Sequence, residues 1–309
     1  MKSRFLQLLL LLGLSCCGAG SAMAELKVAS LHPLLTDLAK QIGGDKVTVL
    51  AVVAAGTDVH HFSPSTQHMK QVAGADLVLA SGKGLENYLG KLRDNMRAGQ
   101  VLLEVGEAIP SLELSEAAAL MEAAEQGHAG HVHGGVDPHW WNSVDNMQRA
   151  IRVVTAAFSK ADASNAAVYE ANAAAYGKKL GELKKWAKRE FSNIPSGQRK
   201  LATAHLSLGY FGQEFGFKLI PVQGLNPEIP ATSKDLAAAV NTIRSSKVRA
   251  VFPEQGVNPK HLAKIAAETG VVFGGELVAD GNGIGPLSTF TGAFEHNVRE
   301  MVKALVPAP

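Results

Sequence analysis

Hydrophobic positions from residue 25 onward alternate between short apolar runs and stretches with helical spacing. The apolar runs predict strands at 27–31, 47–53, 77–80, 101–105, 201–205, 219–222, 248–252 and 271–277. Between them, the helical spacing predicts helices at 34–42, 85–96, 209–215, 233–243, 259–269 and 290–305. Strands that alternate with helices in this way form parallel sheets covered on both faces. The predicted fold class is therefore α/β.

The middle of the chain contains the longest helical pattern. Helices are predicted at 144–160 and at 164–194, the second with Ser164 as its N-cap residue. Its apolar residues follow at intervals of four or three, which places them on one stripe: Tyr169, Ala173, Tyr176, Leu180, Leu183 and Ala187. At about 1.5 Å per residue this helix extends about 40 Å, enough to cross a domain. We predict one long rigid helix joining two lobes, although a helix packed within one domain would show the same pattern.

The pattern divides the chain into four predicted segments. They are a signal peptide at 1–24, an N-terminal α/β lobe at 25–163, the linking helix at 164–194 and a C-terminal α/β lobe at 195–309. Each lobe would contain a mainly parallel sheet flanked by helices. Such sheets bind ligands at the carboxyl ends of their strands, so a shared site is expected in the cleft between the lobes.

The first 24 residues have the features of a secretory signal. Lys2 and Arg4 precede an apolar run at 5–14, and residues 22–24 form a small-residue cleavage site. Cleavage near Ala24 would place the protein in the periplasm. Nothing later in the sequence approaches about 18 consecutive apolar residues, the length of a membrane-spanning helix.

Both cysteines, Cys16 and Cys17, lie inside this signal segment. Lipid anchoring at either one is the alternative to cleavage, and it is less favoured because Gly13 stands where a lipoprotein signal prefers leucine. Cleavage at Ala24 leaves a chain without cysteine, which excludes disulfides, thiolate metal sites and cysteine nucleophiles. Any metal must then be held by nitrogen and oxygen atoms.

The charge of the chain is balanced. Loss of Lys2 and Arg4 reduces the 30 basic residues to 28, against 28 acidic residues. There is no basic stripe of the kind that binds nucleic acid or an anionic membrane surface. Nucleic acid is therefore not an expected partner.

A histidine-rich segment precedes the second half of the chain. In residues 126–135, glycines separate His128, His131 and His133, a composition typical of a flexible loop that captures metal weakly. We expect an accessory role in metal capture. A surface insert without function is the alternative.

Four further residues are placed where a shared site is expected. They are His60 after the second strand, His139 in the run Asp137-Pro138-His139-Trp140-Trp141-Asn142, His205 at the end of the fifth strand, and Asp280 after the eighth strand. Three imidazoles and one carboxylate suit Zn(II), whose bonds to such ligands are about 2.0–2.2 Å long. Manganese generally prefers more oxygen ligands. Four protein ligands leave no open position for an activated water, which argues against catalysis.

These residues also resemble a known family, the metal receptors (solute-binding proteins) of bacterial zinc and manganese ABC importers. The shared motifs span the mature chain: Gly43-Gly44-Asp45-Lys46-Val47, residues 58–64, Asp137-Pro138-His139 with Trp141-Asn142, and Ala204-His205 with Gly209-Tyr210-Phe211. The resemblance implies that the metal ligands are His60, His139, His205 and Asp280. Histidine at the third position, where manganese receptors have glutamate, and the histidine-rich loop both imply the zinc-selective branch. Val59 replaces a proline often found there, so the adjacent His61 stays open as an alternative ligand.

The resemblance also implies a function. The chain would be a periplasmic receptor that binds Zn(II) with high affinity and delivers it to an ABC permease in the inner membrane. A periplasmic zinc metallochaperone is a further candidate partner, and a monomer is expected. A manganese receptor of the same family is the alternative.

A secreted zinc hydrolase is the rival from another class of protein. It would need an open coordination position and a general base, for which Glu254 after the seventh strand is the only obvious candidate. Glu254 in that place is equally suited to orient a ligand imidazole. The sequence contains no His-Glu-x-x-His or Gly-x-Ser-x-Gly motif, so we do not expect an enzyme.

Overall fold

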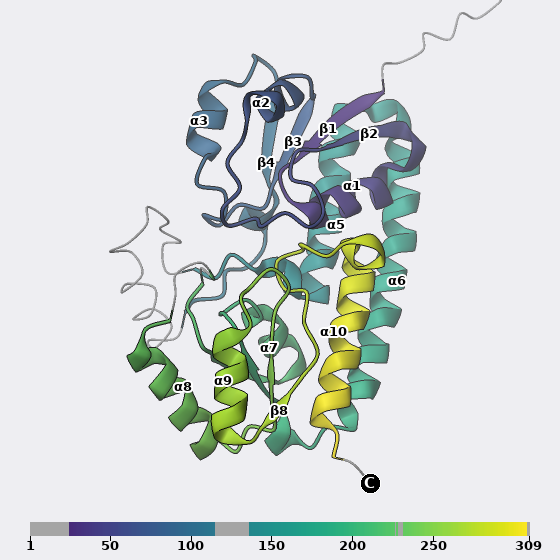
Figure 1. Cartoon of the computed structure of the whole chain (residues 1–309). Helices are drawn as coiled ribbons and strands as arrows, with labels where there is room; N and C mark the ends of the chain where they lie inside the picture. The colour runs from purple at the N-terminus through teal and green to yellow at the C-terminus, as the bar shows by residue number, and fades with distance from the viewer. Residues whose placement is uncertain (1–24, 115–135, 226, 228–230, 308–309) are drawn as a thin grey trace, which may run out of the picture.

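The computed structural model describes residues 25–114, 136–225, 227 and 231–307. Two lobes, each built on a parallel sheet, lie one above the other in Figure 1, and the long helix α6 (Ala166–Ser192) runs along both. This arrangement confirms the predicted α/β class and two-lobe organisation. The signal segment and the histidine-rich loop lie outside the described residues. Within those residues, no helix has the length and apolar character needed to cross a membrane.

The N-terminal lobe contains a parallel sheet with the strand order β2-β1-β3-β4. Its strands are β1 (Leu26–Ser30), β2 (Val47–Ala51), β3 (Leu77–Ala80) and β4 (Val101–Glu104). Its helices are α1 (Pro33–Gly43), α2 (Thr66–Ala73) and α3 (Leu89–Asp94), with short 3-10 turns at Gly44–Lys46 and Val105–Ala108. Every residue of β3 is buried, as expected for a strand covered on both faces.

The C-terminal lobe repeats this topology with the strand order β6-β5-β7-β8, again all parallel. Its strands are β5 (Lys200–Thr203), β6 (Lys218–Pro221), β7 (Ala250–Phe252) and β8 (Val272–Phe273). Its helices are α7 (Gly209–Phe215), α8 (Ser233–Ser245), α9 (Lys260–Thr269) and α10 (Phe290–Leu305), with 3-10 turns at Ser196–Gln198 and Gly285–Ser288.

Helices α5 (Val144–Ala161) and α6 connect the lobes. The buried residues of α6 are the six predicted from its apolar stripe, together with Phe191. This face packs against α1 and α5 and, further along, against α10 of the C-terminal lobe. The predicted N-cap residue was wrong: Ser164 lies in a 3-10 turn (Ala163–Asn165) with its hydroxyl donating to Asp162, and Asn165 precedes the helix instead.

Two predicted elements have half their predicted length or less in the structure. The helix expected at 85–96 begins only at Leu89, because Gly82, Lys83 and Gly84 all have positive φ and the following residues form turns. Strand β8 ends at Phe273, where two glycines follow and weaken the strand. The chain rejoins the sheet through a single parallel bridge between Leu277 and Glu254.

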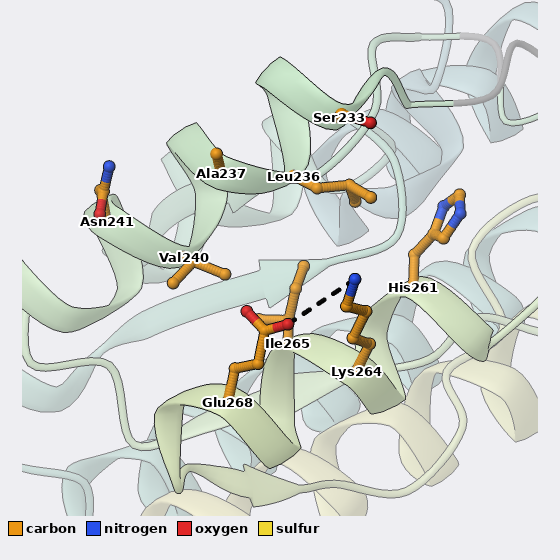
Figure 2. A pocket seen from close by; sticks show the side chains of 9 residues that line it. All are labelled: Ser233, Leu236, Ala237, Val240, Asn241, His261, Lys264, Ile265 and Glu268. Carbon is orange, nitrogen blue, oxygen red and sulfur yellow. Dashed lines mark ion pairs between the residues drawn. The ribbon is translucent and has the colours of Figure 1, made fainter.

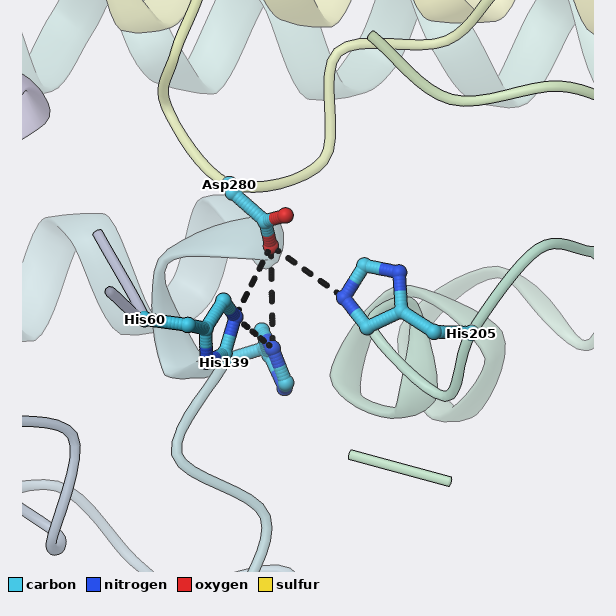
Figure 3. Close-up of side chains that lie close together, drawn as sticks. All are labelled: His60, His139, His205 and Asp280. Atoms are coloured by element: carbon cyan, nitrogen blue, oxygen red, sulfur yellow. Dashed lines mark hydrogen bonds and ion pairs between the residues drawn. The ribbon is translucent and has the colours of Figure 1, made fainter. Parts of the chain in front are cut away.

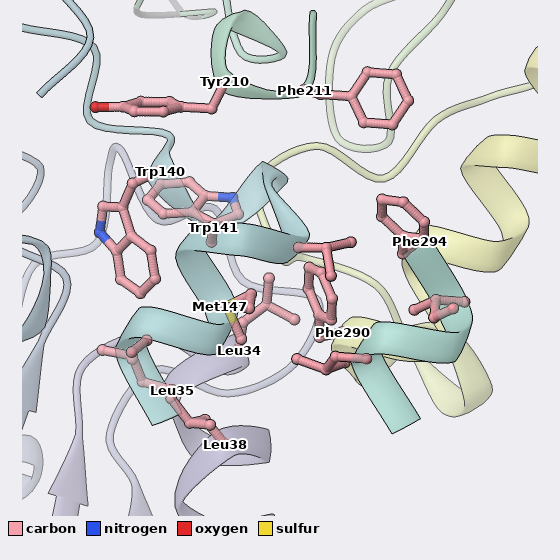
Figure 4. Packing of buried hydrophobic residues seen from close by; sticks show 14 of the residues in the cluster. Leu34, Leu35, Leu38, Trp140, Trp141, Met147, Tyr210, Phe211, Phe290 and Phe294 are labelled. Carbon is pink, nitrogen blue, oxygen red and sulfur yellow. The ribbon is translucent and has the colours of Figure 1, made fainter. Parts of the chain in front are cut away.

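The largest hydrophobic cluster among the described residues extends through both lobes, beside smaller clusters within each lobe. It contains residues of β1 and α1 from the N-terminal lobe, the α6 stripe, and Phe290, Phe294 and Val298 from α10. Figure 4 shows Trp140 and Trp141 in the middle of this cluster, between leucines of α1 and aromatic rings of the C-terminal lobe. The turn that follows His139 is therefore fixed by packing from both sides.

Candidate metal centre

Four side chains from distant parts of the chain meet where the lobes face each other (Figure 3). The Nε2 atoms of His60, His139 and His205 lie 3.6, 3.6 and 3.4 Å from Oδ1 of Asp280. The Nε2 atoms of His60 and His139 lie 3.3 Å apart. All four residues are buried, and their ligand atoms lie within 4.8 Å of one another. Among the described residues, no other group of three or more His, Cys, Asp or Glu side chains could hold a metal ion.

The separations between these atoms suit a four-coordinate cation. A tetrahedron with metal–ligand bonds of about 2.0–2.2 Å has edges of about 3.3–3.6 Å. Four of the six separations among the ligand atoms, from 3.3 to 3.6 Å, fall in that range, and all six are at most 4.8 Å. A small divalent ion can therefore lie among these four ligand atoms.

The fold places each of these residues on a loop at the edge where the strands end. His60 lies in the loop after β2, and His205 follows β5 after one residue. Asp280 lies three residues beyond the Leu277 bridge, and His139 immediately precedes the 3-10 turn Trp140–Asn142. Parallel strands direct these loops to one edge of each sheet, so residues far apart in sequence converge.

Asp137 orients His139. Its Oδ1 accepts the backbone N–H of His139 at 2.9 Å and lies 2.8 Å from the ring Nδ1. The hydroxyl of Tyr210 donates to the backbone carbonyl of Asp137 at 3.0 Å. A Cβ atom at Gly209 would overlap the second carboxylate oxygen of Asp137, so glycine leaves the room this carboxylate needs. With Nδ1 engaged, the Nε2 lone pair is left to face the centre.

Glu254 orients His205 in a similar way. Its Oε2 lies 2.6 Å from His205 Nδ1, and its Oε1 accepts the backbone N–H of His205 at 3.2 Å. The hydroxyl of Ser207 donates to Oε2 at 3.2 Å. Both oxygens are thus engaged and the residue is 1% exposed, an arrangement suited to holding an imidazole rather than to serving as a general base.

Asp58 contacts both His60 and His61, but it holds the backbone of the first and the ring of the second. Its Oδ1 accepts the backbone N–H of His60 at 2.8 Å, while its Oδ2 lies 3.1 Å from Nδ1 of His61. The side chain of His61 is 41% exposed and lies outside the group of four, whereas His60 points into it. The geometry therefore brings together His60, and not His61, with the other candidate ligands.

Burial and charge act in opposite directions on the ionisation of the centre. Burial lowers the pKa of His60, and the carboxylate of Asp280 opposes that shift. Burial alone would also lower the pKa of His205, but Glu254 and Asp280 outweigh it and hold this pKa well above its usual value. Burial would raise the pKa of Asp280, yet His205 and His60 hold it well below its usual value. Asp280 is therefore an anion in the metal-free protein.

Two residues beside the centre, His32 and Asn142, are not among its predicted ligands. His32 is buried and is the N-cap residue of α1, where its ring accepts the N–H of Leu34 at 3.1 Å. Its ring packs on Trp141 with the two ring centroids 4.4 Å apart. Burial lowers the pKa of His32 to about 3. Asn142 donates to the carbonyls of Ser207 at 3.0 Å and Ala279 at 2.8 Å. Their contacts depend on long-range packing, although Asn142 belongs to a motif shared with the metal receptors.

The accessory metal-binding residues predicted in the histidine-rich loop are not tested by the structure. His128, His131 and His133 lie outside the described residues. A pocket between α8 and α9 contains His261 and Glu268, but Glu268 pairs with Lys264 at 3.8 Å (Figure 2). Figure 2 shows no third metal ligand among the labelled residues, so this pocket lacks the donor set found at the centre.

Comparison with protein families gives one match that covers nearly the whole described chain. The model of the family ZnuA, described as the zinc-uptake complex component A, periplasmic, matches residues 28–304. The manganese-binding lipoprotein MntA of Bacillus subtilis is 33% identical over 303 residues, which cover 94% of this chain and 95% of that protein. The metal ABC transporter substrate-binding lipoprotein FimA of Streptococcus parasanguinis is 29% identical, covering 88% of this chain and 86% of that protein.

A solved structure supports the same fold. The periplasmic zinc-binding protein TroA of Treponema pallidum superposes with a TM-score of 0.80, covering 92% of this chain and 99% of that one. The sequence identity is 24%, so this likeness concerns the fold alone. The relatives are named as binding components rather than enzymes, which confirms the expectation that the chain is not an enzyme.

Proposed function

The chain belongs to the ZnuA family of periplasmic zinc-uptake components, and from that premise we propose that it captures Zn(II) outside the inner membrane and delivers it to an ABC permease. The permease is the main partner in this proposal, and a periplasmic zinc metallochaperone that loads the receptor is a second one. The receptor acts as a monomer.

The single observation that carries this proposal is the convergence of His60, His139, His205 and Asp280 with spacing that suits four bonds to zinc. These four residues are the proposed ligands. Three nitrogen donors and one oxygen donor favour zinc over manganese. His205 is the third proposed ligand in chain order, and the manganese receptors that this sequence resembles have glutamate there. The histidine therefore also supports zinc.

Manganese is the second candidate cargo, because relatives such as MntA are named for binding it. The two cargoes require different coordination. Manganese prefers more oxygen ligands than one carboxylate offers, and would need Asp280 to bind through both oxygens or water to enter the buried centre. The donor set therefore supports zinc, and the names of the relatives support manganese.

We also propose the organisation of the whole chain. Residues 1–24 form a cleaved signal peptide, 25–163 and 195–309 are the two lobes, and 164–194 join them. Several relatives are named lipoproteins, which keeps lipid anchoring at Cys16 or Cys17 as the alternative to cleavage near Ala24. The histidine-rich loop at 126–135 serves as an accessory site of metal capture.

A competition titration tests the proposed cargo. Metal-free protein is titrated with Zn(II) and Mn(II) against a chelator of known affinity, beside a variant in which His128, His131 and His133 are alanine. The proposal requires one tight zinc equivalent in both proteins and much weaker manganese binding. Preference for manganese would overturn the cargo, and loss of tight zinc binding in the loop variant would overturn the ligand assignment.

A further inference from the structure

The side-chain amide of Asn142 joins three of the four ligand-bearing segments. Asn142 lies three residues after His139, and its Nδ2 donates to the carbonyl of Ser207, two residues after His205, at 3.0 Å. The same Nδ2 donates to the carbonyl of Ala279, the residue before Asp280, at 2.8 Å. An amide nitrogen has two hydrogens, and here each one has its own acceptor. A single group thus connects the segments of His139, His205 and Asp280.

A second donor from the same turn reinforces this connection. The indole Nε1 of Trp141 donates to the carbonyl of Ala279 at 2.8 Å. That carbonyl therefore accepts two hydrogen bonds, one for each lone pair. Trp141 is 1% exposed, and Asn142 is also buried, so water does not compete for these acceptors. The position of the Asp280 segment relative to the His139 turn is consequently fixed by polar contacts as well as packing.

The Asp280 segment is also held from its other side. The side chain of Asn297 on α10 donates to the carbonyl of Val278 at 2.8 Å and accepts the N–H of the same residue at 2.8 Å. This pair attaches the segment to the C-terminal lobe. Asn142 differs because it attaches the segment to another ligand-bearing turn, and so controls distances within the centre.

From this geometry we infer that Asn142 is a positioning residue that determines metal specificity, with Trp141 in support. The inference rests on the proposed function. By holding the Ser207 and Ala279 carbonyls at once, the amide fixes the separation between His205 and Asp280, whose nearest ligand atoms lie 3.4 Å apart. That separation matches the edge of a zinc tetrahedron, about 3.3–3.6 Å.

The same constraint disfavours manganese. A manganese ion takes a higher coordination number with more oxygen atoms, so the ligands must move apart to admit a second carboxylate oxygen or a water. Hydrogen bonds that tie the ligand-bearing segments together oppose this expansion. Asn142 therefore contributes to zinc affinity and to rejection of manganese through the same two contacts.

The test compares Asn142→Ala with a matched control, Asn172→Ala. Asn172 also donates its amide to a backbone carbonyl of another element, that of Ile42 at 3.0 Å, but it lies on α6 away from the centre. Trp141→Phe is the second variant, because it removes the indole donor and retains a smaller aromatic ring. Each metal-free protein is titrated with Zn(II) and Mn(II) by chelator competition. Circular dichroism and thermal unfolding establish that each variant is folded.

We expect Asn142→Ala to lower zinc affinity by about tenfold to a hundredfold, the range found when a group that orients a metal ligand is removed. Manganese affinity should fall less or rise, so the ratio of zinc affinity to manganese affinity should decrease. Trp141→Phe should decrease the same ratio by a smaller factor, and Asn172→Ala should leave the ratio unchanged. Co(II) bound to Asn142→Ala should lose the intense visible absorption of a four-coordinate site, a change that lower stability alone would not produce.

Equal losses of zinc and manganese affinity, or an unchanged ratio and Co(II) spectrum, would overturn the role of Asn142. If Asn142→Ala does not fold, Trp141→Phe decides the question by the same ratio. These failures are distinct from failure of the proposed function, in which the wild-type protein itself does not prefer zinc.

Discussion

Glu254 Oε2 lies 2.6 Å from Nδ1 of His205, and the opposite ring nitrogen lies 3.4 Å from the carboxylate of Asp280. The imidazole is thus placed between two buried carboxylates, one that would bind the metal and one that would remain outside the coordination sphere. This placement determines both the protonation of the metal-free centre and the orientation of one ligand.

Zinc binding should release a proton at neutral pH. Burial opposes the charge on His205, but Glu254 and Asp280 outweigh it and raise its pKa well above the usual 6.5, so the metal-free imidazole is protonated. Zinc needs the neutral nitrogen and displaces that proton. Zinc affinity should therefore fall as the pH decreases below this raised pKa. Calorimetry in buffers of different ionisation enthalpy measures the number of protons released, and a value of zero at pH 7 would contradict this account.

Replacement of Glu254 by glutamine should weaken zinc binding by about tenfold to a hundredfold, because the ring of His205 loses the anion that orients it. The shape of the side chain is retained, so the effect is one of charge and hydrogen bonding. Proton release should decrease in the same variant. Glu268→Gln on α9, outside the centre, is the control and should bind zinc as the wild type does. Equal affinity in both variants would argue against the orienting role.

Replacement of His139 by alanine should weaken zinc binding by more than about a hundredfold, the upper range for residues that act only through a ligand. The reason is that one of four donors is removed from a buried centre. His261→Ala, on α9 of the C-terminal lobe, is the matched control and should retain full affinity. Chelator competition measures both. Undiminished affinity in His139→Ala would remove this residue from the ligand set.

Replacement of Gly209 by alanine should disturb the centre indirectly. The new Cβ atom would overlap the Asp137 carboxylate and so displace the group that orients His139. Overpacking of this kind costs about 1–3 kcal/mol of unfolding free energy, and zinc affinity should fall as well. Gly177→Ala on α6 is the control, because no atom beyond the local helix backbone lies within 4 Å of the added Cβ. That change should stabilise the protein by about 0.5–1 kcal/mol, as measured by urea unfolding.

Asp37 connects the two lobes through its buried carboxylate. Its Oδ2 accepts the N–H of Phe290, at the start of α10, at 2.9 Å and the hydroxyl of Tyr176 on α6 at 3.4 Å. Asp37→Ala leaves both donors without this acceptor and should lower the free energy of unfolding by about 1–3 kcal/mol. The exposed Asp45, replaced in the same way, should leave stability unchanged. Chemical denaturation of both variants measures the difference, and similar stabilities would contradict the connecting role.

Much of the fold could be predicted from local patterns. The stripe on α6 was read directly from the intervals between Tyr169 and Ala187, because one buried face requires that spacing. The strand β3 and the helices α7 and α10 begin and end at the predicted residues. The length of strand β8 was overestimated because Gly274, Gly275 and Glu276 separate Phe273 from the next apolar residue, Leu277.

The candidate centre was predictable only as a set of loop positions. Strands that end at one edge bring His60, His205 and Asp280 together. The resemblance to metal receptors favoured His60 but left His61 open, and only the geometry placed His60 in the group of four. The contacts of Asn142 were not predictable, since Ser207 and Ala279 are 65 and 137 residues away in sequence. Polar contacts over such separations depend on how the lobes pack, and the sequence pattern does not encode that locally.

The hydrophobic core that passes through both lobes and α6 has a consequence for how occupancy of the centre can be detected. A chain whose largest hydrophobic cluster spans both lobes is expected to melt as one cooperative unit. Zinc that binds only the folded form then stabilises every part of the chain, by about 2.7 kcal/mol when its free concentration is 100 times the dissociation constant. The melting temperature of the whole protein therefore reports on a single ion.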